Sequence, residues 1–210
     1  MKITWFGQAC FEIVTQGGLT LICDPYHPLV GYEAHPRPAD IVTISHEHGD
    51  HNHTGWIEGT PEIVRGVGTR TVKGVNITGL PSFHDGEGGA KRGPNTVFVI
   101  EADGLRLCHL GDLGELPGVE LYDGIGKPDV LMIPVGGFYT IDGEQAAFVA
   151  RSTGARLTIP MHYATGVKET PISAVDCFVR EMGARAMGGA SIEIFQGDSE
   201  TGTVVLDFLR

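Results

Sequence analysis

The feature that most constrains this chain is a short segment in which an apolar run leads directly into a cluster of histidines and acids. Residues 41–53 read IVTISHEHGDHNH, with four histidines and two acids inside the last eight positions. Neutral imidazole and carboxylate groups are the ligands that Zn²⁺ and related divalent ions take in proteins. Burying so many polar groups without partners would cost several kcal/mol, which argues against a role in packing. The segment therefore predicts a metal site at the end of a strand.

Further polar residues follow apolar runs later in the chain. His84 comes after the run 75–80, Asp112 after the run 105–110, and His162 after the run 157–160. In layered α/β folds, ligand sites gather where strands end. We therefore expect these three side chains to meet the histidine cluster at one edge of the fold.

Apolar runs of strand length, bounded by Gly, Pro and Asp, recur throughout the chain. The predicted strands are residues 3–6, 11–15, 19–23, 41–44, 75–80, 96–101, 105–110, 130–134, 157–160 and 191–194. The first three form a predicted meander, in which Gly17 and Gly18 make a hairpin turn.

Two helices are predicted in the second half of the chain. The first begins at Asp142, which stands at capping-box spacing from Gln145, and ends at Gly154. The second begins after Pro171 and ends before Gly183. Strands dominate the first half and alternate with helices in the second. This order predicts two packed sheets with helices outside, in one domain spanning residues 1–210.

Composition excludes several classes of protein. The formal net charge of −11 gives a surface that repels phosphate backbones, so neither a nucleic acid nor an anionic membrane is an expected partner. The four cysteines are scattered among apolar residues without a CxxC pair, which indicates buried, reduced thiols. We find no signal peptide and no run of about 18 apolar residues that would span a membrane. We therefore expect a cytoplasmic protein.

The run His46-Glu-His48-Gly-Asp50-His51 resembles the HxHxDH signature of the metallo-β-lactamase superfamily. The resemblance extends over nearly the whole chain, in the family's order. It implies an α/β fold, the four-layer αβ/βα sandwich of that superfamily, in a single domain. It also implies a two-metal site in which one ion is held by His46, His48 and His84, the second by Asp50, His51 and His162, and both are bridged by Asp112.

The chemistry that follows from this resemblance is metal-dependent hydrolysis. Two ions about 3.5–4 Å apart would share a hydroxide whose pKa is lowered to about 7. That hydroxide would cleave a phosphodiester or a lactone-type ester of a small molecule, with Asp50 as a further candidate proton acceptor. Zn²⁺ is the expected metal, and Mn²⁺ and Fe²⁺ are alternatives because His and Asp accept them too.

Departures from the superfamily's sequence patterns exclude several of its branches. The commonest class B β-lactamases carry Cys where this chain has Asp112, and only 48 residues follow His162, too few for the extra helical domain of glyoxalase II. The chain most resembles small metal-dependent hydrolases of the ascorbate-phosphate lactonase and phosphodiesterase branch. This resemblance alone favours a homo-oligomer. The alternatives are an iron-dependent oxidoreductase on the same fold and a metal-binding protein without catalysis.

Two residues are candidates to support the ligands. Asp24 occupies the family's first acidic position, and we expect it to orient the histidine loop through hydrogen bonds rather than bind metal. His109 is the alternative to His84 as the third ligand, because it lies three residues before Asp112. Strand alternation places His109 on the face opposite Asp112, which favours His84. If His84 is the ligand, we expect His109 to support the ligands or to contact the substrate.

Four more residues are candidates for substrate contact or support. Arg92 and Asn95 belong to a small basic loop, residues 91–95, in an otherwise acidic chain. The loop is either an anion-recognition element or a solvated turn. Tyr163, beside His162, is a candidate contact for substrate or a developing oxyanion, and Tyr139 is a second candidate of the same kind.

Overall fold

The computed structural model describes residues 1–210, with sixteen strands, three α-helices and two short 3-10 helices. The strands are β1 (Lys2–Gly7), β2 (Cys10–Val14), β3 (Thr20–Cys23), β4 (Arg37–Pro38), β5 (Ile41–Ile44), β6 (Ile57–Glu58), β7 (Glu62–Arg65), β8 (Gly68–Val72), β9 (Val75–Phe83), β10 (Pro94–Ala102), β11 (Leu105–His109), β12 (Val130–Pro134), β13 (Leu157–Met161), β14 (Arg185–Ala186), β15 (Ser191–Glu193) and β16 (Gly202–Val205). The helices are α1 (Val119–Ile125), α2 (Gly143–Thr153), α3 (Asp176–Met182), η1 (Pro28–Val30) and η2 (Thr54–Trp56).

The first sheet has the strand order β15-β1-β2-β3-β5-β7. β1, β2 and β3 form the predicted antiparallel meander, and β5 then pairs parallel to β3. Because β3 and β5 run the same way, the residues that follow them, Asp24 and Ser45, emerge at the same edge of the sheet.

The second sheet has the strand order β14-β16-β13-β12-β11-β10-β9-β8. The long strands β9 and β10 are antiparallel, as are β10 and β11, so β9 and β11 run in the same direction. β11, β12 and β13 are parallel neighbours. The carboxyl ends of β9, β11, β12 and β13 therefore share one edge.

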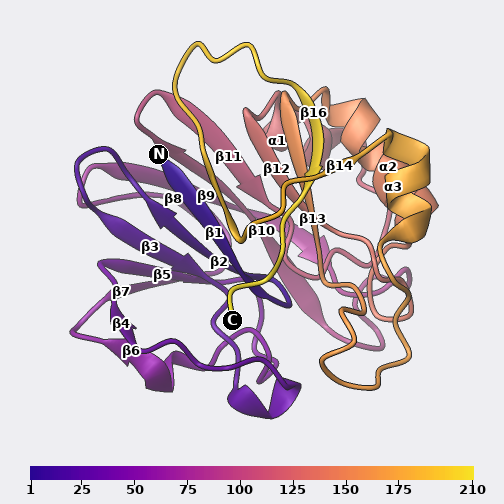
Figure 1. The fold of residues 1–210 in the computed structure, drawn as a ribbon, viewed down its shortest axis with the longest axis horizontal. Helices are drawn as coiled ribbons and strands as arrows, with labels where there is room; N and C mark the ends of the chain where they lie inside the picture. The colour runs from indigo at the N-terminus through magenta and orange to yellow at the C-terminus, as the bar shows by residue number, and fades with distance from the viewer.

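The main core lies between the two sheets. Alternate side chains of the first sheet, such as Ile3, Trp5 and Phe11, pack in one buried cluster with Val99 and Leu131 of the second sheet. Helix α2 packs against β12 and α3, and Figure 1 shows α2 and α3 together outside β13 and β16. Apolar burial between two sheets, with helices on an outer face, is the arrangement that the strand and helix order predicts.

The outer face of the first sheet is covered by irregular chain rather than by an α-helix. Phe6, Ile22 and Val42 point to this side and form a smaller core with Tyr26 and Trp56. These two aromatic residues belong to residues 24–56, which carry η1 and η2 below the first sheet in Figure 1. The predicted α/β sandwich is confirmed. In this sandwich, the irregular segment covers the outer face of the first sheet.

Comparison of the predicted and observed elements shows one helix confirmed and one misplaced. Asp142 caps α2, and its side chain and that of Gln145 make both hydrogen bonds of the capping box. The second predicted helix begins at Asp176, not after Pro171, because residues 164–175 are drawn into a loop in which the N–H of Ser173 donates to the carbonyl of Gly136. Helix α1 and the short or exposed strands β4, β6, β7, β8, β14 and β16 were not predicted.

Two of the compositional expectations can be compared with the structure. All four cysteines are free thiols, and Cys10, Cys23 and Cys108 are buried, as predicted, while Cys177 is half-buried. None of the helices has both the length and the apolar character needed to cross a membrane.

Candidate metal centre

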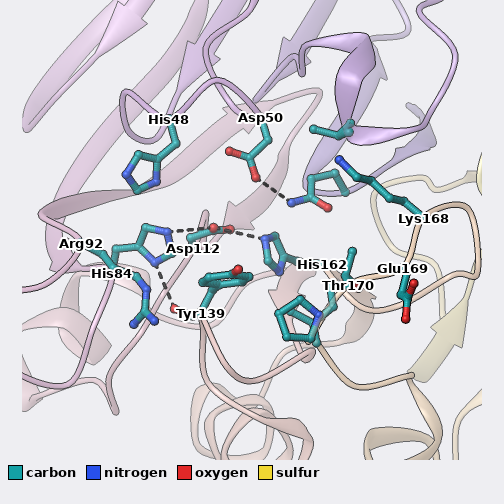
Figure 2. Close-up of a pocket in the computed structure, with 14 residues that line it drawn as sticks. His48, Asp50, His84, Arg92, Asp112, Tyr139, His162, Lys168, Glu169 and Thr170 are labelled. Carbon is teal, nitrogen blue, oxygen red and sulfur yellow. Dashed lines mark hydrogen bonds and ion pairs between the residues drawn. The ribbon is translucent and has the colours of Figure 1, made fainter.

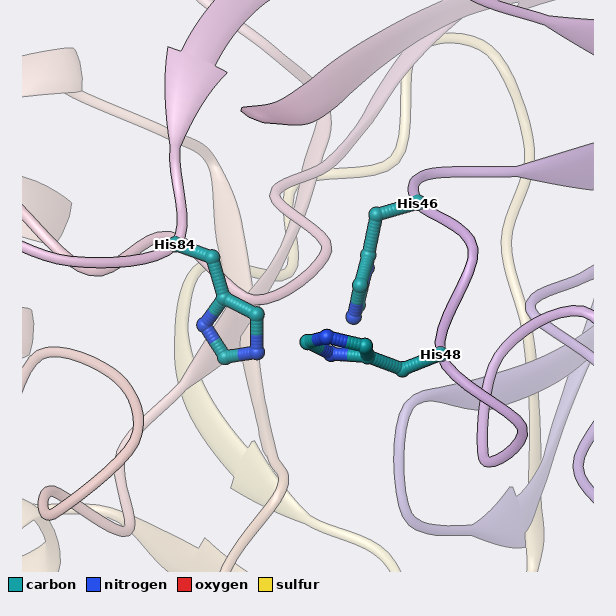
Figure 3. A group of neighbouring side chains, drawn as sticks. All are labelled: His46, His48 and His84. Atoms are coloured by element: carbon teal, nitrogen blue, oxygen red, sulfur yellow. The ribbon is translucent and has the colours of Figure 1, made fainter. Parts of the chain in front are cut away.

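The predicted ligands meet at the edge where the parallel strands of both sheets end. Figure 3 shows His46 and His48, from the loop after β5, pointing toward His84, which follows β9. The ligand atoms of these three histidines lie within 4.8 Å of one another. A second group with the same spacing consists of Asp50, His51 and His162. The structure thus brings together both predicted sets of three.

Asp112 lies between the two groups. Its Oδ2 atom is 3.2 Å from Nε2 of His84 and 4.0 Å from Nε2 of His46 in the first group. The same oxygen is 3.2 Å from Nε2 of both His51 and His162 in the second group. Figure 2 shows Asp112 between His84 and His162. One carboxylate oxygen therefore faces imidazole nitrogens of both groups.

Several of the atoms that would bind a metal make no hydrogen bond within the protein. Nε2 of His46, Nε2 of His51 and Oδ1 of Asp112 are buried and make no hydrogen bond. An orphaned buried polar group costs about 1–3 kcal/mol. Imidazole nitrogens and carboxylate oxygens are also the donors that Zn²⁺ and similar ions take. The residues present therefore fit a divalent cation.

Hydrogen bonds on the far side of three rings direct Nε2 into the centre. Nδ1 of His51 donates to Oδ2 of Asp24 over 2.8 Å, and Nδ1 of His84 donates to the carbonyl of Tyr139 over 3.1 Å. The Ser45 hydroxyl donates to Asp24, so it accepts from Nδ1 of His46 over 2.9 Å. A ring whose proton is held on Nδ1 presents the lone pair of Nε2 to a metal.

The electrostatics of the centre favour positive charge at its middle. Burial alone would raise the pKa of Asp112, but the facing His162 and His51 hold its pKa well below the usual range. Burial alone would likewise lower the pKa of His51, yet Asp112 and Asp50 raise its pKa well above the usual value. Burial lowers the pKa of His46 to about 3, which keeps that ring neutral. The carboxylates therefore hold positive charge at the middle of the centre, as a proton on His51 when no metal is bound. A bound cation would displace that proton, because an imidazole that binds a metal must be neutral.

Asp24 supports the ligands from behind. Its carboxylate is fully buried and accepts from the backbone N–H of Ser45 over 2.8 Å, as well as from Ser45 Oγ and His51 Nδ1. Although Asp24 lies close enough to His46 and His51 to form a third group of possible ligands, its oxygens are already occupied by these hydrogen bonds. The position matches the predicted orienting role.

Asn95 and His109 hold the turn that carries Asp112. The Asn95 amide accepts from the backbone N–H of Asp112 over 3.0 Å and donates to the carbonyl of Leu110 over 2.9 Å. His109 is fully buried, and its Nδ1 accepts from the backbone N–H of Gly111 over 3.2 Å while its Nε2 donates to the carbonyl of Ala9 over 2.8 Å. It belongs to none of the ligand groups. Neither side chain lines the pocket over the centre. The geometry therefore favours His84 over His109 as the third ligand.

A residue that the sequence did not single out also contacts the centre. Gln8 lies in the turn between β1 and β2, and its Nε2 donates to Oδ2 of Asp50 over 2.9 Å. Its backbone carbonyl accepts from the N–H of His162 over 3.0 Å. No motif marks Gln8, because its role depends on β1 and β13 ending side by side.

A pocket of about 460 Å³ opens over the metal centre. Arg92 and Tyr139 line it on the side of His84, whereas Lys168 and Thr170 line it on the far side of His162 (Figure 2). The structure does not place Tyr163 at this pocket, contrary to the prediction. His162 has a left-handed backbone with φ 52°, and the ring of Tyr163 packs on Trp5 with 5.2 Å between the centroids.

Comparison with known proteins agrees with the superfamily that the sequence resembles. Residues 2–162 match the family model of the beta-lactamase superfamily domain. A relative from Methanoculleus marisnigri, described as a UPF0173 metal-dependent hydrolase, is 36% identical over 188 residues, which cover 79% of this chain and 82% of that protein.

Solved structures extend the likeness. A Thermotoga maritima protein of the metallo-beta-lactamase superfamily, proposed to be a Zn-dependent hydrolase, superposes with a TM-score of 0.84 at 37% identity over 99% of both chains. CmlA, a diiron beta-hydroxylase from Streptomyces venezuelae, shares the fold with a TM-score of 0.59 at 15% identity, over 79% of this chain and 45% of that one. The family model and the relatives, together with a ligand cluster at the strand ends, show that this chain belongs to the metallo-beta-lactamase superfamily and to its family of UPF0173 metal-dependent hydrolases.

Proposed function

We propose that this protein is a two-metal hydrolase that cleaves a phosphodiester or a lactone-type ester of a small molecule. The observation that carries the proposal is the position of Asp112, whose Oδ2 lies 3.2 Å from Nε2 of His84 in one ligand group and of His51 in the other. A carboxylate shared between two ligand groups is suited to bridge two ions. A single ion would leave one of the groups without a partner.

The bound ions would supply a Lewis acid for the substrate oxygen and a shared hydroxide as nucleophile. The chain's own residues prepare the site for this chemistry. Asp24 and Ser45 fix the rings of His46 and His51 from behind. Asp50 lines the pocket with a side chain that is 32% exposed, held by Gln8, and is thus placed to accept a proton from the substrate side.

Pocket size and charge support a small substrate. A volume of about 460 Å³ is in the range that small-molecule sites occupy. The net charge of −11 disfavours nucleic acid as a substrate. The Thermotoga maritima relative is proposed to be Zn-dependent, which supports Zn²⁺ as the metal here.

The test is elemental analysis of the purified protein combined with turnover of bis(4-nitrophenyl) phosphate and a panel of lactones. We expect close to two metal ions per chain and turnover of one substrate class. His48→Ala and Asp112→Ala should lose metal and turnover. His53→Ala is the matched control, because His53 belongs to the same loop but to none of the ligand groups. Full metal content and activity in both ligand variants would overturn the assignment.

The same experiment separates the hydrolase from an iron oxidoreductase. CmlA, a diiron beta-hydroxylase, shows that this fold accommodates a diiron enzyme, and Fe²⁺ accepts the same histidine and aspartate ligands. Iron in the protein as purified, without hydrolysis of either substrate class, would replace the hydrolase proposal with the oxidoreductase.

A further inference from the structure

Arg92 differs from most arginines of this chain because its guanidinium has no carboxylate partner. Arg37, Arg65 and Arg106, for example, each pair with a glutamate. Arg92 has no carboxylate oxygen within 4.0 Å, although it is half-buried and lines the pocket beside His84. Its only side-chain contact of an electrostatic kind is the face of Tyr139, 5.2 Å from Cζ to the ring centroid. A half-buried cation in a pocket, free of ion pairs, is available to a ligand.

The loop that carries Arg92 is built to hold it in place. The buried carboxylate of Asp85 accepts four backbone N–H groups, from Glu87, Gly89, Lys91 and Arg92, over 2.7–3.0 Å. The loop closes where the N–H of His84 donates to the carbonyl of Gly93 over 3.1 Å. Arg92 is therefore fixed relative to the adjoining ligand His84, and this is more order than a solvated turn requires.

The chemistry of the group indicates what it would bind. A guanidinium presents a planar fork of donors that matches a carboxylate or a phosphate with two parallel hydrogen bonds. The other cation of the pocket, Lys168, lies on the opposite side and already donates to the carbonyl of Leu29 over 3.0 Å. Tyr139 supplies a flat wall that orients the guanidinium plane.

We infer that Arg92 and Tyr139 form an anion subsite, so that the substrate carries a carboxylate or phosphate substituent beside the bond that is cleaved, on the His84 side of the metal centre. The inference rests on the proposed hydrolase function for the identity of the reaction. The subsite itself is defined by Arg92, Tyr139 and the Asp85-bound loop.

The first arm of the test compares two esters of similar length, mono-4-nitrophenyl succinate, which carries a carboxylate, and neutral 4-nitrophenyl pentanoate. Arg92→Met should lower kcat/KM for the anionic ester about 10- to 100-fold, because a hydrogen-bonded charge is lost, and leave the neutral ester nearly unchanged. Lys91→Met is the matched control, since it removes an equal charge from the neighbouring exposed residue, which pairs with Glu87. Equal losses for both esters in Arg92→Met would overturn the subsite.

The second arm does not depend on turnover. Calorimetry on the metal-loaded protein measures binding of phenylphosphonate, benzoate and the neutral dimethyl phenylphosphonate. Arg92→Met should weaken binding of the anions about 10- to 100-fold, whereas Lys91→Met should not, and the anion that loses more identifies the preferred group. Unchanged anion affinity in Arg92→Met would refute the subsite even if the protein hydrolyses both esters. Loss of anion binding in a protein that hydrolyses nothing would support the subsite and reject the hydrolase.

Discussion

Replacement of Asp24 by Asn tests how the fold directs histidine nitrogens at the metal. The carboxylate is fully buried, and its Oδ2 accepts from Nδ1 of His51 over 2.8 Å. Asn is the smallest available change. It keeps the shape of the side chain, and it tolerates the left-handed backbone of this position, φ 45°, better than Ala would. The variant therefore alters hydrogen bonding without adding backbone strain.

The magnitude follows from the hydrogen bonds that Asn can replace. Its remaining oxygen can still accept from the backbone N–H of Ser45, but its NH₂ group would face the proton on Nδ1 of His51. Either that buried donor stays unpaired, at a cost of about 1–3 kcal/mol in the free energy of unfolding, or the proton moves to Nε2. The second outcome removes the lone pair that faces Asp112. Loss of such a supporting group lowers metal affinity about 10- to 100-fold.

The assay is a metal titration against a competing chelator, combined with urea unfolding of the metal-free protein. We expect the affinity of the group containing Asp50, His51 and His162 to fall most. Asp123→Asn, an exposed carboxylate on α1, is the control and should change neither quantity. Two ions bound by Asp24→Asn with unchanged affinities would refute the argument that Asp24 sets the tautomer of His51.

Three further predictions concern the same region. Gln8→Ala removes the hydrogen-bond donor 2.9 Å from Asp50 Oδ2 and should lower kcat about 10-fold with metal content unchanged. Loss of metal with kcat per metal ion preserved would show that Gln8 supports metal binding instead. Gly111→Ala places a Cβ atom 2.4 Å from Oδ1 of Asn95 at φ 55° and should lower the free energy of unfolding. Gly18→Ala is the control, because its added Cβ meets nothing within 4 Å, and it should lower this free energy less. Equal losses in urea unfolding would mean that the contact at Gly111 relaxes freely. Chelator-treated protein should gain about 2.7 kcal/mol of stability when Zn²⁺ is added at 100 times its dissociation constant, and an unchanged urea midpoint would contradict a folded-state metal site.

The proposed ligands could be predicted because each follows a strand that the apolar pattern already marks. His46, His84, Asp112 and His162 come directly after such runs, and parallel pairing brings the ends together. The histidine-rich segment needed no tertiary information, since its ligands are neighbours in sequence. The local sequence was therefore sufficient to predict a ligand wherever the position of its side chain is set by the strand that precedes it.

Prediction failed where distant segments decide the conformation. The second predicted helix loses its first turn because residues 164–175 line the pocket with Thr170 and Ile172 instead. Gln8 has no local signature, because its amide acts on Asp50, which is 42 positions away. Edge strands such as β8 were missed because most of their side chains are exposed and polar, which removes the apolar signal.

Backbone strain is concentrated around the centre, in the turns that adjoin the proposed ligands. Of the six non-glycine residues with positive φ, Gln8, Asp24, Phe138 and His162 lie in the turns that surround the centre, and the other two lie in hairpin turns. A left-handed residue of this kind costs about 1–3 kcal/mol and persists only where its surroundings hold it. Here the N–H of His162 donates to the carbonyl of Gln8, and the N–H of Asp24 donates to the carbonyl of Thr43. Because hydrogen bonds between the strand ends hold these turns, we expect that metal binding does not have to supply the free energy that would order them.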